Sequence, residues 1–86
     1  MPELLVLADG AMAAGKTHEA VKYLKKILFI NRRKHSALLD LAECYIKLGK
    51  FSDCFRLLQR AIKYYPDDFE FHHIRGFVHA RVGLQG

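Results

Sequence analysis

Residues 38–66 read LLDLAECYIKLGKFSDCFRLLQRAIKYYP, and the spacing of their apolar side chains decides the fold. Residues three and four apart are neighbours on the surface of a helix. On that spacing the apolar residues before Gly49 form one stripe, which consists of Leu38, Leu41, Ala42 and Tyr45. Those after Gly49 form a second stripe, which consists of Phe51, Cys54, Phe55, Leu58, Ala61 and Ile62. Pro66 ends the second stripe, because proline lacks the N–H that a continuing helix needs. The stretch therefore predicts two amphipathic helices joined by a tight turn at Gly49 and Lys50.

The small residues of this stretch are as informative as the large ones. Ala42, Cys54 and Ala61 allow two helix backbones to approach closely while larger side chains fill the space beside them. The order of large and small residues resembles the tetratricopeptide repeat (TPR), on the positions Leu38, Leu41, Ala42, Tyr45, Cys54, Leu58 and Pro66. The resemblance implies a stack of helical hairpins that turns as a right-handed superhelix.

The same pattern occurs twice in the chain. A shift of 34 residues places Leu4 on Leu38, Leu5 on Leu39, Leu7 on Leu41, Ala8 on Ala42, Gly15 on Gly49, Lys16 on Lys50 and Leu24 on Leu58. This period is that of the TPR, and it predicts helices at about residues 3–14 and 17–30. Asp67 and Asp68 then supply an N-cap for a fifth helix that runs to about residue 82.

We therefore predict one all-α domain over residues 1–86, a right-handed superhelix of five helices. It divides into a first repeat at 1–34, a second at 35–68 and a partial third at 69–86. The last helix has no second helix to complete its hairpin, and such arrays usually end in a polar capping helix. We expect that part of its apolar surface docks a partner helix or a second copy of the chain. The residues concerned are Phe71, Ile74, Phe77, Val78 and Val82.

Composition and charge are those of an ordinary globular protein. The chain of 86 residues is 51% hydrophobic and 27% charged, which excludes a disordered or collagen-like polymer. Its formal net charge of +5 permits an acidic partner without identifying one. Cys44 and Cys54 do not make a disulfide framework, and we expect both to be reduced. No run approaches the roughly 18 apolar residues of a membrane span, and the first residues lack the pattern of a secretory signal. We therefore expect a cytoplasmic protein, with an organelle matrix as the open alternative.

One motif suggests enzymatic chemistry. Residues 10–17, GAMAAGKT, match the pattern G-x-x-x-x-G-K-[ST] of a phosphate-binding P-loop. The roles of holding the phosphates and a magnesium ion would fall on Gly15, Lys16 and Thr17. A P-loop needs a parallel sheet behind it, however, and residues 35–86 do not alternate strand and helix patterns. The Gly-Lys pair also recurs one repeat later, as part of a turn. Nucleotide binding is therefore the third of our hypotheses on function.

The histidines and carboxylates do not form a recognisable catalytic or metal site. His72 and His79 lie seven residues apart on one helical face, but no third ligand is evident, and a zinc site needs at least three protein ligands. No arrangement of Ser, His and Asp, or of Cys and His, follows from the spacing. We therefore predict that the protein is not an enzyme and has neither a metal nor another cofactor.

The first helix of each repeat carries a second set of side chains that hairpin packing does not need. The resemblance implies that these helices line a concave groove, and we expect the groove to hold a peptide or helix of a partner protein. Its acidic residues indicate a basic and apolar ligand. For Leu5 and Leu39 the alternative role is packing between neighbouring repeats. The predicted groove residues are Leu5, Asp9, Met12, Leu39, Asp40, Glu43, Ile46, His73 and Phe77.

Basic residues concentrate on the second helices. Residues 16–34 and 50–66 carry 11 of the 14 Lys and Arg residues but only two of the nine acids. The densest patch consists of Lys22, Lys25, Lys26, Arg32, Arg33 and Lys34. Charge runs are usually solvated faces; the alternative is contact with an acidic protein, an anionic membrane or RNA phosphates. Our first hypothesis is a protein-interaction module, such as an adaptor, assembly subunit or chaperone-like protein, and the second is a component of a ribonucleoprotein.

Overall fold

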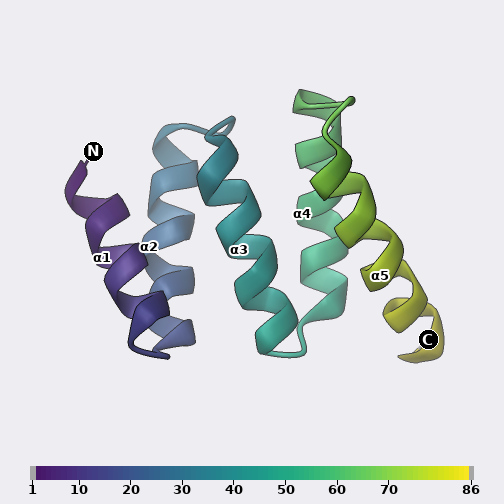
Figure 1. Ribbon diagram of the computed structural model, residues 1–86, viewed down its shortest axis with the longest axis horizontal. Coiled ribbons are helices and arrows are strands. Elements are labelled where there is room, and N and C mark those ends of the chain that lie inside the picture. The colour runs from purple at the N-terminus through teal and green to yellow at the C-terminus, as the bar shows by residue number, and fades with distance from the viewer. Residues whose placement is uncertain (1, 86) are drawn as a thin grey trace.

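The computed structural model describes residues 2–85, and these form five α-helices connected by short turns (Figure 1). The helices are α1 (Pro2–Ala13), α2 (Thr17–Ile30), α3 (His35–Lys47), α4 (Phe51–Tyr64) and α5 (Phe69–Gln85). Each helix packs against the next one along the chain, from α1 on α2 to α4 on α5. The predicted all-α class with five helices is confirmed over the described residues.

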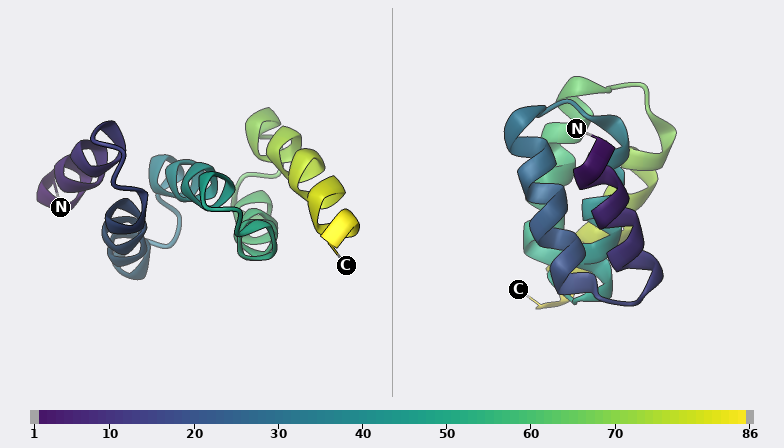
Figure 2. Two further views of the ribbon diagram at one scale, coloured as in Figure 1. Left: turned by 90° about the horizontal axis from the view of Figure 1, so that it is seen from below. Right: turned by 90° about the vertical axis from the view of Figure 1, so that its left-hand side faces the viewer.

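The helices form two layers (Figure 2, left). The first helices of the hairpins and the last helix, α1, α3 and α5, lie in one layer, and α2 and α4 lie in the other. The stack is elongated, with extents of 36 × 26 × 18 Å. Helices of the two layers alternate along the stack. As a result, α3, the first helix of the second hairpin, contacts both α2 and α4.

Both hairpins turn on a glycine. Gly15 and Gly49 have φ angles of 77° and 72°, in the left-handed region that glycine enters without steric cost. At the second turn the N–H of Gly49 donates to the Ile46 carbonyl oxygen at 3.1 Å, and the N–H of Lys50 donates to the Tyr45 carbonyl oxygen at 2.8 Å. The first turn has the equivalent pair of bonds. These bonds satisfy carbonyl groups that the end of a helix leaves unpaired, so the predicted stop at Gly49 is confirmed.

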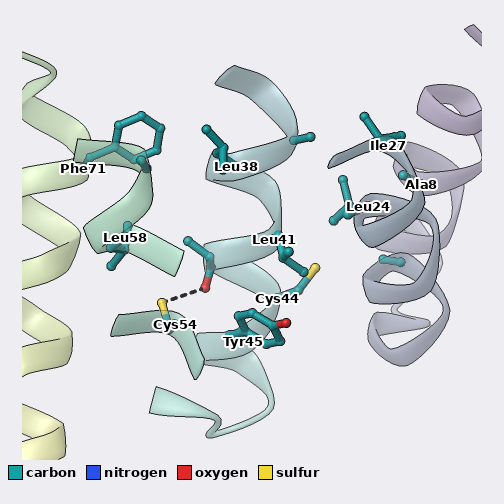
Figure 3. Close-up of a cluster of buried hydrophobic side chains, with 14 of the residues drawn as sticks. Ala8, Leu24, Ile27, Leu38, Leu41, Cys44, Tyr45, Cys54, Leu58 and Phe71 are labelled. Atoms are coloured by element: carbon teal, nitrogen blue, oxygen red, sulfur yellow. Dashed lines mark hydrogen bonds between the residues drawn. The ribbon is translucent and has the colours of Figure 1, made fainter. Parts of the chain in front are cut away.

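The core is a continuous set of side chains between the helices (Figure 3). Small residues within it let the backbones approach; those that are 0% exposed are Ala20, Ala37, Ala42, Cys44, Cys54 and Ala61. The Cys54 thiol donates a hydrogen bond of 3.4 Å to the Ala42 carbonyl oxygen and so joins α4 to α3. Burial raises the pKa of Cys54 to about 11, so its thiol stays protonated and unreactive at neutral pH.

A polar and aromatic junction, which the sequence analysis did not predict, joins the two inter-repeat turns. The Tyr65 hydroxyl donates to the Arg33 carbonyl oxygen. His35 Nε2 lies 2.6 Å from Asp68 Oδ2, and the His35 ring lies 5.1 Å from the Tyr65 ring and 4.9 Å from the Phe71 ring, measured between centroids. The other Asp68 oxygen accepts the Phe71 N–H at 3.2 Å, which confirms the predicted N-cap of α5. The hydrogen bond from His35 lowers the pKa of Asp68 below its ordinary value.

The last helix is better covered than the sequence predicted. Phe71 and Val78 are 0% exposed, and Ile74 and Val82 are half-buried against the core. The expectation that these residues offer a surface to a partner was therefore wrong for Phe71 and Val78, because the stack itself covers both. Among the five residues only Phe77 is exposed, and the Arg81 guanidinium lies 4.8 Å from the centre of its ring.

The turn geometry predicts opposite effects of alanine at two glycines. Gly49→Ala should lower the free energy of unfolding by about 1–2 kcal/mol, because a Cβ strains the left-handed backbone. Gly76→Ala should raise it by about 0.5–1 kcal/mol, because Gly76 lies inside α5 and an added Cβ would meet no atom within 4 Å. Urea unfolding followed by circular dichroism measures both. Equal destabilisation by the two variants would contradict the assignment of the turn.

The junction predicts an acid-sensitive contribution to stability. Because the pKa of Asp68 is lower in the folded protein than its ordinary value of 3.8, its contribution is present above that value and is lost as pH falls through the folded pKa. Asp68→Asn should therefore lower the melting temperature at pH 6, and the difference from wild type should shrink towards pH 3. Asp67→Asn, at the exposed neighbouring carboxylate, controls for the lost charge. A difference that stays constant from pH 6 to pH 3 would argue against the His35–Asp68 contact.

Candidate functional site

The acidic residues of the predicted groove interact across two helices. Asp9 lies in α1, and Asp40 and Glu43 lie in the following first helix, α3. Asp9 and Glu43 are exposed, whereas Asp40 is half-buried. Burial raises the pKa of Asp40, and the nearby negative charges of Glu43 and Asp9 raise it further. The fold therefore gathers three carboxylates from residues up to 34 apart into one electrostatic cluster, which we call the acidic face.

The apolar residues predicted for the groove are partly available. Leu5 and Met12 in α1, and Leu39 and Ile46 in α3, are each half-buried and pack against the core. Packing between repeats, the alternative role of Leu5 and Leu39, thus accounts for part of each side chain and leaves the rest at the surface. These four residues flank the carboxylates of the acidic face at helical spacing.

The predicted groove residues of α5 are both exposed. The His73 ring stacks on the Phe69 ring at 6.0 Å, and Phe77 is 44% exposed beneath Arg81. Both lie in the same layer as α1 and α3 (Figure 2), two positions along the stack from α1. A ligand that contacts Asp9 and Phe77 would therefore extend along the whole layer.

The residues of the predicted basic patch lie in different surroundings. Lys25 and Arg32 border a shallow depression between α2 and α4, together with Arg56 and Arg60, which the sequence analysis did not single out. Lys22 and Lys26 are exposed and do not line it. The Arg33 guanidinium lies 5.5 Å from the centre of the Tyr64 ring, and Lys34 is half-buried at the start of α3. Arg56 and Arg60 of α4 are far from Lys25 and Arg32 in the sequence, and the four residues meet at one depression only in the folded protein.

The two surfaces lie on opposite faces of α3. Leu38, Leu41 and Tyr45 form the floor of the depression, whereas Leu39, Glu43 and Ile46 are the α3 residues of the predicted groove. At about 100° of rotation per residue, the centres of these two sets are roughly 130° apart around the helix axis. A ligand on one surface therefore leaves the other accessible.

The P-loop pattern lies at the end of a helix. Residues 4–7, an apolar run that precedes the pattern, belong to α1 and do not form a strand. The N–H groups of Gly15 and Lys16 already donate to the carbonyl oxygens of Met12 and Ala11, at 3.1 and 2.8 Å. These amides are therefore not free to surround a phosphate, as the backbone of a P-loop does.

The two histidines considered as metal ligands have other neighbours. His72 Nε2 lies 2.6 Å from the Pro66 carbonyl oxygen, and the His79 ring lies 5.6 Å from the Phe55 ring. Within residues 2–85 no three His, Cys, Asp or Glu side chains are grouped so that they could hold a metal ion. In the same range, no helix combines the length and the apolar character that crossing a membrane requires.

Comparison with protein families identifies the repeat. A sequence model of the family described as "Tetratricopeptide repeat" matches residues 11–76, which run from the second half of α1 to the middle of α5. A search of curated proteins found no match.

From the charges of the acidic face we expect that Asp40 destabilises the free protein. Because the pKa of Asp40 is raised in the folded protein, stability falls as pH rises from 3.8 through the raised value, and the loss persists at pH 7. Asp40→Asn should therefore raise stability at pH 7 by about 0.5 kcal/mol, the size of one like-charge contact on a helix. This corresponds to roughly 2–4 °C in melting temperature.

Calorimetry at pH 7 and pH 4 tests this. The matched variant Asp67→Asn removes the same charge outside the acidic face and should produce no comparable gain. A destabilised Asp40→Asn variant at pH 7 would show that the carboxylate has a structural role instead.

Proposed function

This chain belongs to the tetratricopeptide repeat family, and from this premise we propose that it holds a basic, apolar peptide or helix of a partner protein on the layer of α1, α3 and α5. Repeats of this family are in general protein-interaction modules and typically act as non-catalytic scaffolds. The family alone does not identify a ligand, because one fold serves many functions. The proposal on the ligand therefore depends on the residues of the acidic face.

The observation that carries the proposal is the clustering of Asp9, Asp40 and Glu43. Like charges held together by a fold, one of them half-buried, cost folding free energy, as the raised pKa of Asp40 indicates. Lys or Arg side chains of a ligand would relieve that repulsion when they bind. A cost in the free protein that binding removes is typical of a functional site rather than of a structural one.

The apolar residues beside the cluster provide the second component of binding. The exposed parts of Leu5, Met12, Leu39 and Ile46 would contribute about 25 cal/mol for each Å² that a ligand covers. Methionine adapts its shape to different apolar surfaces, so Met12 suits a ligand groove. An amphipathic segment with alternate basic and apolar side chains matches both components.

A cytoplasmic location, as an adaptor or assembly subunit, is part of this proposal. Cys44 and Cys54 are free and buried, and the fold has its core without a disulfide. A protein of this kind suits a reducing compartment.

The proposal can be tested with a designed peptide of 15 residues that carries Leu at helical i, i+3, i+4 and i+7 positions and Lys elsewhere. We expect chemical-shift changes in a titration of the ¹⁵N-labelled protein to centre on Asp9, Asp40 and Glu43. The double variant Asp9→Asn with Glu43→Gln should weaken binding about tenfold, which corresponds to 1.4 kcal/mol.

A matched control removes the same two charges elsewhere. Glu19 and Asp67 are exposed and lie outside the acidic face, so Glu19→Gln with Asp67→Asn should leave the affinity within about twofold of wild type. Equal losses in both double variants, or shifts centred on α2 and α4, would refute binding at the acidic face.

A further inference from the structure

A shallow depression of about 630 Å³ lies between α2 and α4, with α3 beneath it. We propose that it binds an acidic amphipathic helix of a partner protein, independently of any ligand on the acidic face. Its floor consists of Leu38, Leu41 and Tyr45, whose exposed fractions of 2%, 3% and 7% leave only their outer edges accessible. The floor of the depression is therefore apolar, and the side chains of its rim determine which kind of ligand it binds.

The wall formed by α2 has cations at both ends. Lys25, Leu28 and Phe29 lie on one face of α2, and Arg32 follows in the turn after this helix ends at Ile30. Phe29 is 85% exposed although it borders an apolar floor. An exposed aromatic residue beside partly covered leucines is where a binding partner gains most from contact.

The wall formed by α4 repeats this arrangement. Arg56 and Arg60 alternate with Leu57 and Tyr64 at helical spacing. One acid, Asp53, also lines the depression, and the Arg56 guanidinium lies 2.8 Å from its carboxylate. Four cations and one paired acid leave the rim with a net positive charge. Charge complementarity therefore selects carboxylates on the ligand.

The shape of the depression favours a helix. On the α4 side the lining runs within the helix from Asp53 to Tyr64, so at 1.5 Å for each of the eleven steps along the chain this wall is roughly 16 Å long. Two to three turns of helix fit this length. The apolar stripe of such a helix would cover the leucines and Phe29 while its Glu and Asp side chains reach Lys25, Arg32, Arg56 and Arg60.

The same features favour a protein over RNA. Two of the three floor residues, Leu38 and Leu41, are aliphatic, and each wall adds a leucine; leucine side chains neither stack on bases nor pair with phosphates. Arg33, the neighbouring cation most suited to a phosphate, already lies over the Tyr64 ring. A ligand that buries apolar side chains gains from the floor, whereas a nucleic acid would gain only from the rim.

The test uses the full chain and a fluorescein-labelled designed peptide of 15 residues, with Leu at helical i, i+3, i+4 and i+7 positions and Glu elsewhere. Fluorescence anisotropy should show saturable binding at 0.15 M salt. Arg56→Glu with Arg60→Glu should weaken it at least tenfold. Lys22→Glu with Lys26→Glu changes the net charge equally on exposed residues outside the depression and should weaken it no more than about threefold.

A second pair of variants tests the apolar contact without a change of charge. Phe29→Ala should weaken binding about tenfold, whereas Phe69→Ala, which removes an equally exposed ring outside the depression, should have no effect. Both side chains are so exposed, at 85% and 80%, that neither change should disturb the fold. Circular dichroism verifies this.

Two results would overturn the proposal. If the two charge variants lose the same affinity and Phe29→Ala has no effect, peptide binding depends only on the overall positive charge of the protein. A single-stranded uridine 12-mer that displaces the labelled peptide at a lower concentration than the unlabelled peptide would instead make the depression a nucleic-acid site. Neither result bears on the acidic face, because that site is tested with a basic peptide and other variants.

Discussion

The close approach of helix backbones at small buried side chains is the constraint on which the structure depends. Ala42 on α3 and Cys54 on α4 are both fully buried, and the thiol of one bonds the carbonyl oxygen of the other. Any larger side chain at either position would push the two helices apart. The separation of α3 from α4 fixes the position of α4 opposite α2, and thus the width of the depression between them. The small size of the Ala42 and Cys54 side chains thereby sets the width of a depression that neither residue lines.

The fold separates its charges through α3, which serves two surfaces at once. Its acidic side interacts with Asp9 of α1, and its apolar side forms the floor between the basic helices α2 and α4. α3 can contribute to both surfaces because it carries different residues on two of its sides. The net charge of +5 describes neither surface, since opposite local potentials are averaged in that sum. The two proposed ligands, one basic and one acidic, would therefore bind to different faces of the protein.

The helices and their turns could be predicted from the sequence because their signals are local. The apolar spacing within each helix, the turn glycines and the Asp68 cap each depend on residues close together in the chain, and the 34-residue period repeats these local patterns. What could not be predicted depends on distant residues. His35 meets Asp68 across 33 positions, and Arg56 joins Lys25 at one rim only because α3 holds their helices side by side. The cover over Phe71 and Val78 was missed for the same reason, since a one-dimensional pattern does not say how far neighbouring helices wrap around a terminal one.

In the part of the chain that the structure describes, the strongest contacts run from each helix to the next, and this has a consequence for the motions of the stack. Because the described helices pack mainly on their neighbours along the chain, opening can begin at either end and proceed inward with a small cost at each step. Local contacts of this kind also favour fast folding. A ligand that spans α1, α3 and α5 would stabilise the array, because it would connect helices whose main contacts are with α2 and α4 and not with one another. Hydrogen exchange at the end helices should then slow the most on binding, and the bound partner would set how cooperatively the array unfolds.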